Sequence, residues 1–149
     1  MFLIQFQTVC APYHIFRRIE QRIHLYSPLS LVVGAEDAVD QTDGDLSAFE
    51  GDGVTIACRY KTSVTASLLW YKQQAHRFPE FMMIRNTYNT DGTTEEMFKE
   101  RFHSKVNTAL KTVPLTIQNL QVSDSAVYYC ALKPTVTAAH LTLIQKRHG

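Results

Sequence analysis

Histidine, aspartate and serine side chains are the groups in this chain that acid–base or nucleophilic chemistry would use. The 149 residues include six histidines, and aspartates and serines occur in many segments. None of them falls into an H-E-x-x-H metal motif, a G-x-S-x-G nucleophile motif or a glycine-rich phosphate loop. The sequence therefore predicts no catalytic residue and no enzymatic activity.

Cysteine chemistry is the second possibility. The chain has three cysteines, Cys10, Cys58 and Cys130, which lie far apart in the sequence. A zinc cluster needs pairs of ligands about two to four residues apart, and no such pair exists here. We therefore expect no metal site and no cofactor.

Composition limits the class of protein further. The chain is 45% hydrophobic and 19% charged, and its net charge is +1 from 15 basic and 14 acidic residues. This length suits one domain of about 100–200 residues with a buried core. The balanced charge argues against nucleic acid as a partner, and no run of about 18 apolar residues predicts a membrane span.

Short strand signals follow one another between turn-rich segments. In the first, the chain alternates so that Val54, Ile56 and Cys58 lie on one face. Many short strands without long helical periodicity predict an all-β sandwich or barrel. The expected strands are Val54–Tyr60, Leu68–Gln74, Phe81–Ile84, Arg101–Val106, Val113–Ile117 and Ala126–Leu132.

One constellation is more specific than these strands. Cys58, Trp70 and Cys130 follow one another on separate expected strands, and Cys130 closes an Asp-x-Ala-x-Tyr-x-Cys run that begins at Asp124. In this order and spacing the sequence resembles an immunoglobulin variable domain, and more closely an unrearranged, germline T-cell receptor alpha variable segment. The resemblance covers Glu36 to Leu132. It also rests on Trp70-Tyr71-Lys72-Gln73, Phe78-Pro79-Glu80-Phe81, Arg101-Phe102 and Leu115-Thr116-Ile117.

The resemblance implies an immunoglobulin V-type β-sandwich of two antiparallel sheets in a Greek key. In that fold Cys58 and Cys130 form the disulfide between the sheets, and Trp70 packs on it. Tyr128 is placed for a tyrosine corner, in which its hydroxyl returns to the backbone upstream. Arg101 and Asp124 are expected to form a structural ion pair at the base of the domain.

The resemblance also implies two binding surfaces. Gln73 is expected at the interface with a paired receptor chain of beta type. The loops at one end of the sandwich are expected to bind ligand: the first is about Lys61–Ser67, the second about Asn86–Asp91, and the third begins after Cys130. The expected ligand-binding residues are Lys61, Thr62, Ser63, Arg85, Asn86, Tyr88 and Asn89.

The function that the resemblance implies is antigen recognition in adaptive immunity. The chain is expected to bind peptide presented by MHC molecules as half of a heterodimer, with signalling left to associated chains. A disulfide needs an oxidising compartment, so the expected location is the secretory pathway and then the outer face of the plasma membrane. The alternative is a V-set innate immune or adhesion receptor that never rearranges.

Residues 1–35 differ from the rest of the chain. A basic stretch is followed by the moderately apolar segment Leu25–Val33 and then by Gly34 and Ala35, which is the order of a secretory signal peptide. An amphipathic transit peptide and a misjoined first exon are the alternatives.

The tail, residues 133–149, has no Phe-Gly-x-Gly motif, although a complete variable domain ends on a strand with that motif. We expect the last strand to be missing or replaced by a non-native tail, which would leave an open sheet edge. Codons for Pro134-Thr135-Val136 and Ile144–Arg147 are compatible with the heptamer and nonamer of a recombination signal, at the spacing of its longer type. The alternative is a genuine strand at Ala138–Ile144.

Overall fold

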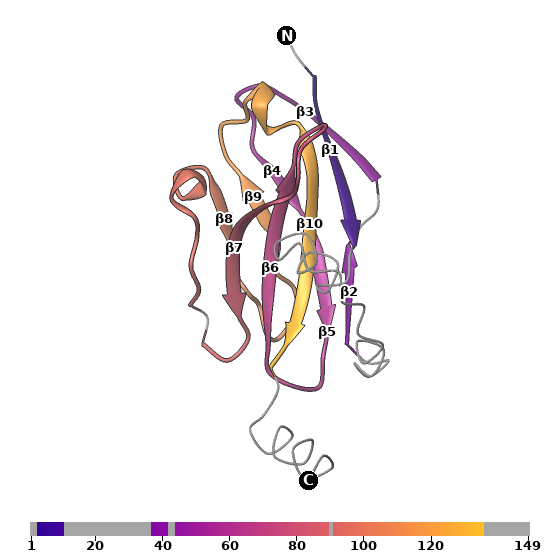
Figure 1. The fold of residues 1–149 in the computed structure, drawn as a ribbon, viewed down its shortest axis with the longest axis vertical. Helices are drawn as coiled ribbons and strands as arrows, with labels where there is room; N and C mark the ends of the chain where they lie inside the picture. The colour runs from indigo at the N-terminus through magenta and orange to yellow at the C-terminus, as the bar shows by residue number, and fades with distance from the viewer. Residues whose placement is uncertain (1–2, 11–36, 42–43, 90, 136–149) are drawn as a thin grey trace.

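The computed structural model describes residues 3–10, 37–41, 44–89 and 91–135, and these ranges form two facing β-sheet layers (Figure 1). The larger layer has five strands in the order β3-β1-β10-β6-β7. Their bounds are β1 Leu3–Cys10, β3 Gly44–Phe49, β6 Ala66–Gln73, β7 Glu80–Asn86 and β10 Ala126–Pro134.

The second layer consists of shorter strands. β2 (Ala38–Gln41) pairs with β5 (Cys58–Lys61), and β4 (Val54–Ile56) pairs with β9 (Leu115–Ile117), which pairs with β8 (Phe102–Ser104). β4 and β5 follow one another with only Ala57 between them. The Val113 N–H donates to the carbonyl of Cys58, so the pairing with the segment before β9 continues past this break. The described helices are two 3-10 turns, η2 (Glu96–Phe98) and η3 (Val122–Asp124).

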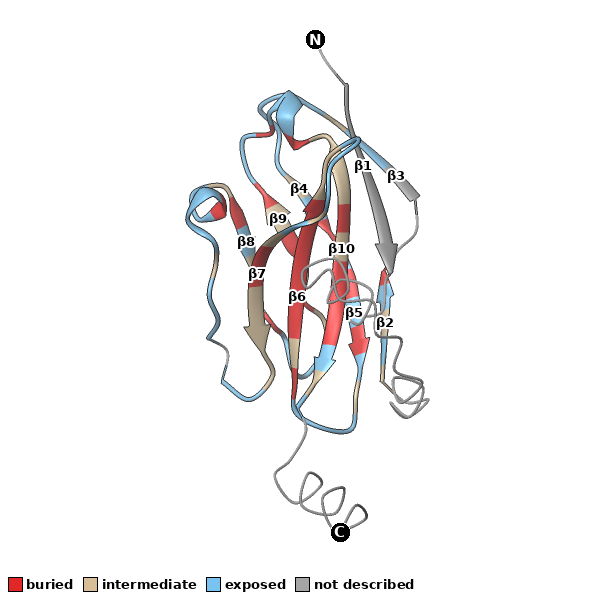
Figure 2. Ribbon diagram, viewed as in Figure 1, coloured by how far each residue is buried: buried red, intermediate tan, exposed pale blue. Residues whose placement is uncertain are grey.

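The core lies between the two layers and follows the alternation of the strands. Along β4 and β5, Ile56, Cys58 and Tyr60 are buried, while Thr55, Ala57 and Arg59 are exposed. Trp70 and Tyr128 have no exposed surface and belong to the same apolar cluster as the two cysteines. Figure 2 shows this buried strip along β6, β5 and β10. The predicted all-β V-type sandwich is confirmed.

The structure differs from expectation at the sheet edge beside β10. In a V-type sandwich the strand after the second cysteine would lie there. Here β1 pairs with β10 in parallel, from Phe6 opposite Ala126 to Cys10 opposite Cys130. The edge is therefore covered over Ala126–Cys130, because a segment from the start of the chain supplies the missing hydrogen-bonding partner.

The predicted domain boundaries at both ends of the chain remain predictions. Strand β1 lies inside the predicted leader, and residues 11–35 of that leader are outside the described residues, so the leader remains a prediction. β10 continues to Pro134, two residues beyond the predicted end of the domain. Residues 136–149, including the alternative strand at 138–144, also lie outside the described ranges. Among the described residues, no helix has the length and apolar character needed to cross a membrane.

Candidate functional site

The predicted ligand-binding loops come together at one end of the sandwich, the lower end in Figure 1. The connection from β5 to β6 meets the end of β10, where the Thr135 N–H donates to the Thr65 carbonyl at 2.9 Å. The chain after β7 meets the start of β6, directly after this connection, since the Thr87 N–H donates to the Ala66 carbonyl at 3.0 Å. These hydrogen bonds place the first two expected loops and the start of the third next to one another, and we call this end of the sandwich the loop end.

The first loop presents side chains with little internal bonding. Lys61 and Ser63 are exposed, and Thr62 is half-buried. The Thr62 hydroxyl bonds both the N–H and the carbonyl of Val64, each at 3.2 Å. This short turn fixes the backbone locally and leaves Lys61 and Ser63 facing solvent.

Arg85 and Asn86 are engaged inside the protein. The Arg85 guanidinium donates to the carbonyls of Ser104, Ile84 and Thr93 and to the hydroxyl of Thr94, at distances of 2.7 to 3.1 Å. These bonds use four of its five N–H groups. Burial lowers the pKa of Arg85 from its ordinary value. Arg85 therefore holds β7 against the segments that carry Ser104 and Thr93. Of the predicted ligand-binding residues, it is the one whose side chain is most engaged inside the protein.

Asn86 joins the first and second loops. Its side-chain oxygen accepts from the Ser67 hydroxyl at 2.8 Å, and its amide nitrogen donates to the Asp91 carbonyl at 3.0 Å. Beyond it, Tyr88 is 57% exposed and Asn89 is also exposed. An exposed tyrosine offers a large contact area for little conformational entropy, and asparagine offers adaptable hydrogen bonds. Tyr88 and Asn89 are the second-loop residues that this geometry makes accessible to a ligand.

Gln73 lies on the opposite face of the five-stranded sheet from the core. Its side-chain oxygen accepts from the Tyr129 hydroxyl at 2.7 Å, and its nitrogen donates to the Arg77 carbonyl at 3.0 Å. These bonds use one of two amide hydrogens and one of two lone-pair positions. The two bonds hold the amide of Gln73 in place. Because Gln73 is only half-buried, its second amide hydrogen and second lone pair can still bond a partner chain.

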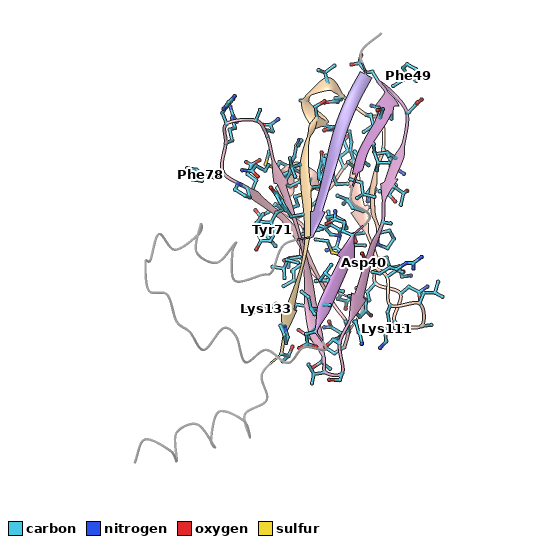
Figure 3. All side chains as sticks on the ribbon, turned by 90° about the vertical axis from the view of Figure 1, so that its right-hand side faces the viewer. Asp40, Phe49, Tyr71, Phe78, Lys111 and Lys133 are labelled. Atoms are coloured by element: carbon cyan, nitrogen blue, oxygen red, sulfur yellow. A yellow bond between two sulfur atoms is a disulfide. The ribbon has the colours of Figure 1, made fainter. Side chains whose placement is uncertain are left out.

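A second apolar cluster shares this outer face. Leu69, Tyr71 and Ala131 are buried, with Phe81 and Tyr129 packed against them. The rings of Tyr71 and Phe81 meet edge to face, with their centroids 5.8 Å apart. Beside this cluster, the connection from β6 to β7 carries Phe78, which is 76% exposed and points away from the sheets (Figure 3). We call this cluster, with Gln73 and Phe78, the outer face.

The predicted ion pair lies at the end of the sandwich opposite the loops, which we call the base. Arg101 and Asp124 form two parallel hydrogen bonds, Nη1 to Oδ2 at 2.6 Å and Nη2 to Oδ1 at 2.9 Å. The Gln121 N–H also donates to Oδ2, at 2.9 Å. The Tyr128 hydroxyl donates to the Asp124 carbonyl at 2.8 Å, which is the tyrosine corner.

Asp124 is completely buried, so its charge depends on these partners. Burial alone would raise the pKa of Asp124. The Arg101 and Gln121 hydrogen bonds and the positive charges of Arg101 and Lys72 outweigh burial and lower that pKa below its ordinary value. The hydrogen bond with Asp124 likewise raises the pKa of Arg101. The base therefore holds an ionised, fully bonded carboxylate at neutral pH.

Sequence reasoning missed two buried polar residues. Gln41 donates its side-chain amide to the Tyr128 carbonyl at 3.1 Å and accepts from the Cys130 N–H at 3.2 Å. Lys72 donates to the Ser123 carbonyl at 3.1 Å and lies 3.7 Å from Oδ1 of Asp124. Alternation along Trp70-Tyr71-Lys72-Gln73 puts Lys72 on the same side as Trp70, so the sequence could have predicted that Lys72 faces the core. Gln41 gave no comparable signal. Within the described ranges, no three histidine, cysteine or acidic residues gather as a metal site.

Comparison with known proteins agrees with this geometry. The family model described as "Immunoglobulin V-set domain" matches residues 41–142. The chain is 36% identical over 96 residues to the T-cell receptor alpha chain V region RL-5 of Oryctolagus cuniculus, which covers 64% of this chain and 68% of that protein. It is 31% identical over 109 residues to the human T cell receptor alpha variable 12-1, covering 72% of this chain and 90% of that one. The human T cell receptor alpha variable 18 is 32% identical over 97 residues, or 65% of this chain and 82% of that one.

Proposed function

Because the chain belongs to the immunoglobulin V-set family, together with T-cell receptor alpha variable segments, we propose that it is an antigen-recognition domain of an alpha-type receptor chain. The observation that carries this proposal is the loop end. There, hydrogen bonds bring the predicted loops side by side while Lys61, Tyr88 and Asn89 remain exposed. A rigid sandwich with exposed polar and aromatic loop residues suits the recognition of a protein surface.

The ligand in this proposal is a peptide held by an MHC molecule. The partner is a beta-type chain that docks on the outer face, where a positioned glutamine amide lies next to an apolar aromatic cluster. An aromatic centre with a few satisfied polar groups is a common composition for a protein interface. Signalling falls to chains associated with the complete receptor.

The proposed location is the outer face of the plasma membrane, reached through the secretory pathway. The support is the disulfide between Cys58 and Cys130, which joins the two layers in the core. Such bonds form and persist in oxidising compartments.

Lymphocyte transcripts primed in the Val54–Trp70 codons test the receptor proposal most directly. We expect reads that diverge just after Cys130 and converge on a Phe-Gly-x-Gly strand and a constant region. In that case residues after about Pro134 are translated germline sequence, with a recombination heptamer in the Pro134–Val136 codons. Transcripts that all continue unchanged to Gly149 would instead identify a non-rearranging V-set receptor.

Chain pairing is tested separately by co-expression with a beta-type variable domain. Gln73→Ala should weaken heterodimer formation, while Gln118→Ala should leave it unchanged, because Gln118 is exposed after β9 in the other layer. Analytical ultracentrifugation of both mixtures measures the difference. Equal pairing by the two variants would remove Gln73 from the interface.

A further inference from the structure

Strand β1 lies between β10 and β3 and pairs with both (Figure 1). On one side it runs parallel to β10, over Phe6–Cys10. On the other side it runs antiparallel to β3, from Leu3 opposite Phe49 to Thr8 opposite Gly44. Among the described strands, β3 pairs with β1 alone, so β3 joins this sheet only through β1.

We call the strip between β3 and residues Ala126–Cys130 of β10 the strand slot. Both of its walls carry backbone N–H and carbonyl groups that need partners, and an unfilled slot would expose two strand edges at once. On the β10 wall, the Gln41 side chain already bonds two of these groups, the Tyr128 carbonyl and the Cys130 N–H, and the remaining groups of the strip are left for a strand. Occupation of the slot by a strand is therefore favoured whichever segment supplies it.

Strand β1 pairs with the first part of β10. The pairing with β1 ends at Cys130, whereas β10 continues to Pro134 and stays paired with β6 over that length. Strand β1 thus covers β10 over Ala126–Cys130.

We propose that the strand slot is a strand-binding site, that Leu3–Cys10 is its built-in occupant, and that displacing this segment makes the slot an acceptor for a second copy of the same strand. Recognition is by main-chain hydrogen bonds, as in β-strand addition. Because Leu3–Cys10 belongs to the same chain, its local concentration at the slot far exceeds that of a dilute free strand. The chain thus blocks its own acceptor edge for as long as it keeps Leu3–Cys10, and this does not depend on which ligand the loop end binds.

Cross-linking in the full chain tests the occupancy. Gln7 and Val127 are paired residues, and neighbouring strands lie about 5 Å apart, which is within the roughly 4.4–6.8 Å that a disulfide spans between Cα atoms. Gln7→Cys with Val127→Cys, in a Cys10→Ser background, should form an intramolecular disulfide on oxidation. The control, Gln7→Cys with Lys133→Cys, should not, because Lys133 lies roughly 20 Å farther along β10. No cross-link in a folded Gln7/Val127 variant, or equal cross-linking in both, overturns the proposal.

Proline substitution tests the same pairing without new cysteines. Gln7→Pro removes a backbone N–H from β1, whereas Gln7→Ala keeps it. Hydrogen exchange should speed up on the order of tenfold in β3 for the proline variant only, and it should stay unchanged in β7 of both variants. Unchanged exchange in β3 of the proline variant contradicts the pairing.

A synthetic peptide tests the acceptor. The probe is the Leu3–Cys10 sequence with serine in place of cysteine, carrying biotin, and a scrambled peptide is the control. The Gln7→Pro chain should capture on the order of tenfold more probe than the unmodified chain, because its tethered strand competes less well for the slot, and neither should capture the scrambled peptide. Equal capture by the two chains, or no capture by the proline variant, shows that the slot does not accept an added strand.

Discussion

The base and the loop end of this sandwich use hydrogen bonds differently. At the base, Asp124 is fully buried and binds groups distant in the sequence, above all Arg101. At the loop end the bonds are made by backbone, hydroxyl and amide groups and by the Arg85 guanidinium, without a buried ion pair, and Lys61, Tyr88 and Asn89 stay exposed. A buried charge that loses its partner is costly, whereas an exposed side chain is replaced with little effect. The comparison assigns stability to the base and recognition to the loop end.

The largest expected effect comes from the disulfide that joins the layers between these two ends. Cys58→Ala with Cys130→Ala opens a loop of 72 residues, and the chain-entropy model gives a loss of about 4 kcal/mol in unfolding free energy. This is a large share of the roughly 5–15 kcal/mol that stabilises a typical domain. Urea unfolding followed by Trp70 fluorescence measures the loss. An unchanged midpoint would show that packing alone holds the two layers.

The next effect isolates the base. Asp124→Ala removes the partner of Arg101 and leaves Lys72 buried next to an uncharged side chain. Breaking a buried pair in this way should lower the unfolding free energy by about 3 kcal/mol, because Arg101 still reaches some solvent. The matched control is Glu96→Ala, which removes an exposed ion pair with Lys99. The Lys99 side chain is 56% exposed and the Glu96 side chain is 89% exposed. We expect no measurable change in the control. Similar losses in the two variants would contradict the special role of the base.

Lowering the pH tests the role of Asp124 in a second way, with a smaller expected change in the unfolding free energy. The folded state lowers the pKa of Asp124, so Asp124 contributes stability above its unfolded pKa of about 3.9. That contribution disappears as the pH falls through the lower, folded-state pKa. Unfolding free energy should therefore fall below about pH 4 in the unmodified chain and fall less steeply in Asp124→Asn. Parallel pH profiles for the two proteins would place the acid-sensitive group elsewhere.

The sequence predicted the core and the base better than the sheet edge. Cys58, Trp70, Tyr128 and Cys130 recur at fixed spacing because one packed arrangement needs them, so their pattern carries its own structure. The parallel pairing of β1 with β10 had no such signal. Pairing between strands that are distant in the sequence depends on backbone hydrogen bonds. Any sequence can make those bonds, so the side chains do not reveal which strands pair.

The second loop shows a further limit of sequence reasoning. Arg85 and Tyr88 lie three residues apart, and both suited ligand contact by type and position. Only the structure separates them, because Arg85 meets Ser104 and Thr94 from other segments while Tyr88 remains 57% exposed. Which neighbours a side chain meets is set by tertiary packing, and short-range patterns do not encode it.

These two residues give the smallest effect and the finest test of the comparison. Arg85→Ala removes four hydrogen bonds and should lower the unfolding free energy by about 1–3 kcal/mol. Tyr88→Ala should change it by less than about 0.5 kcal/mol. In a receptor paired with its beta-type chain and its own peptide–MHC ligand, surface plasmon resonance should show faster dissociation for Tyr88→Ala. If Tyr88→Ala lowered the unfolding free energy and left binding unchanged, Tyr88 would contribute to stability and not to recognition. The proposed contrast between the loop end and the base would then be wrong.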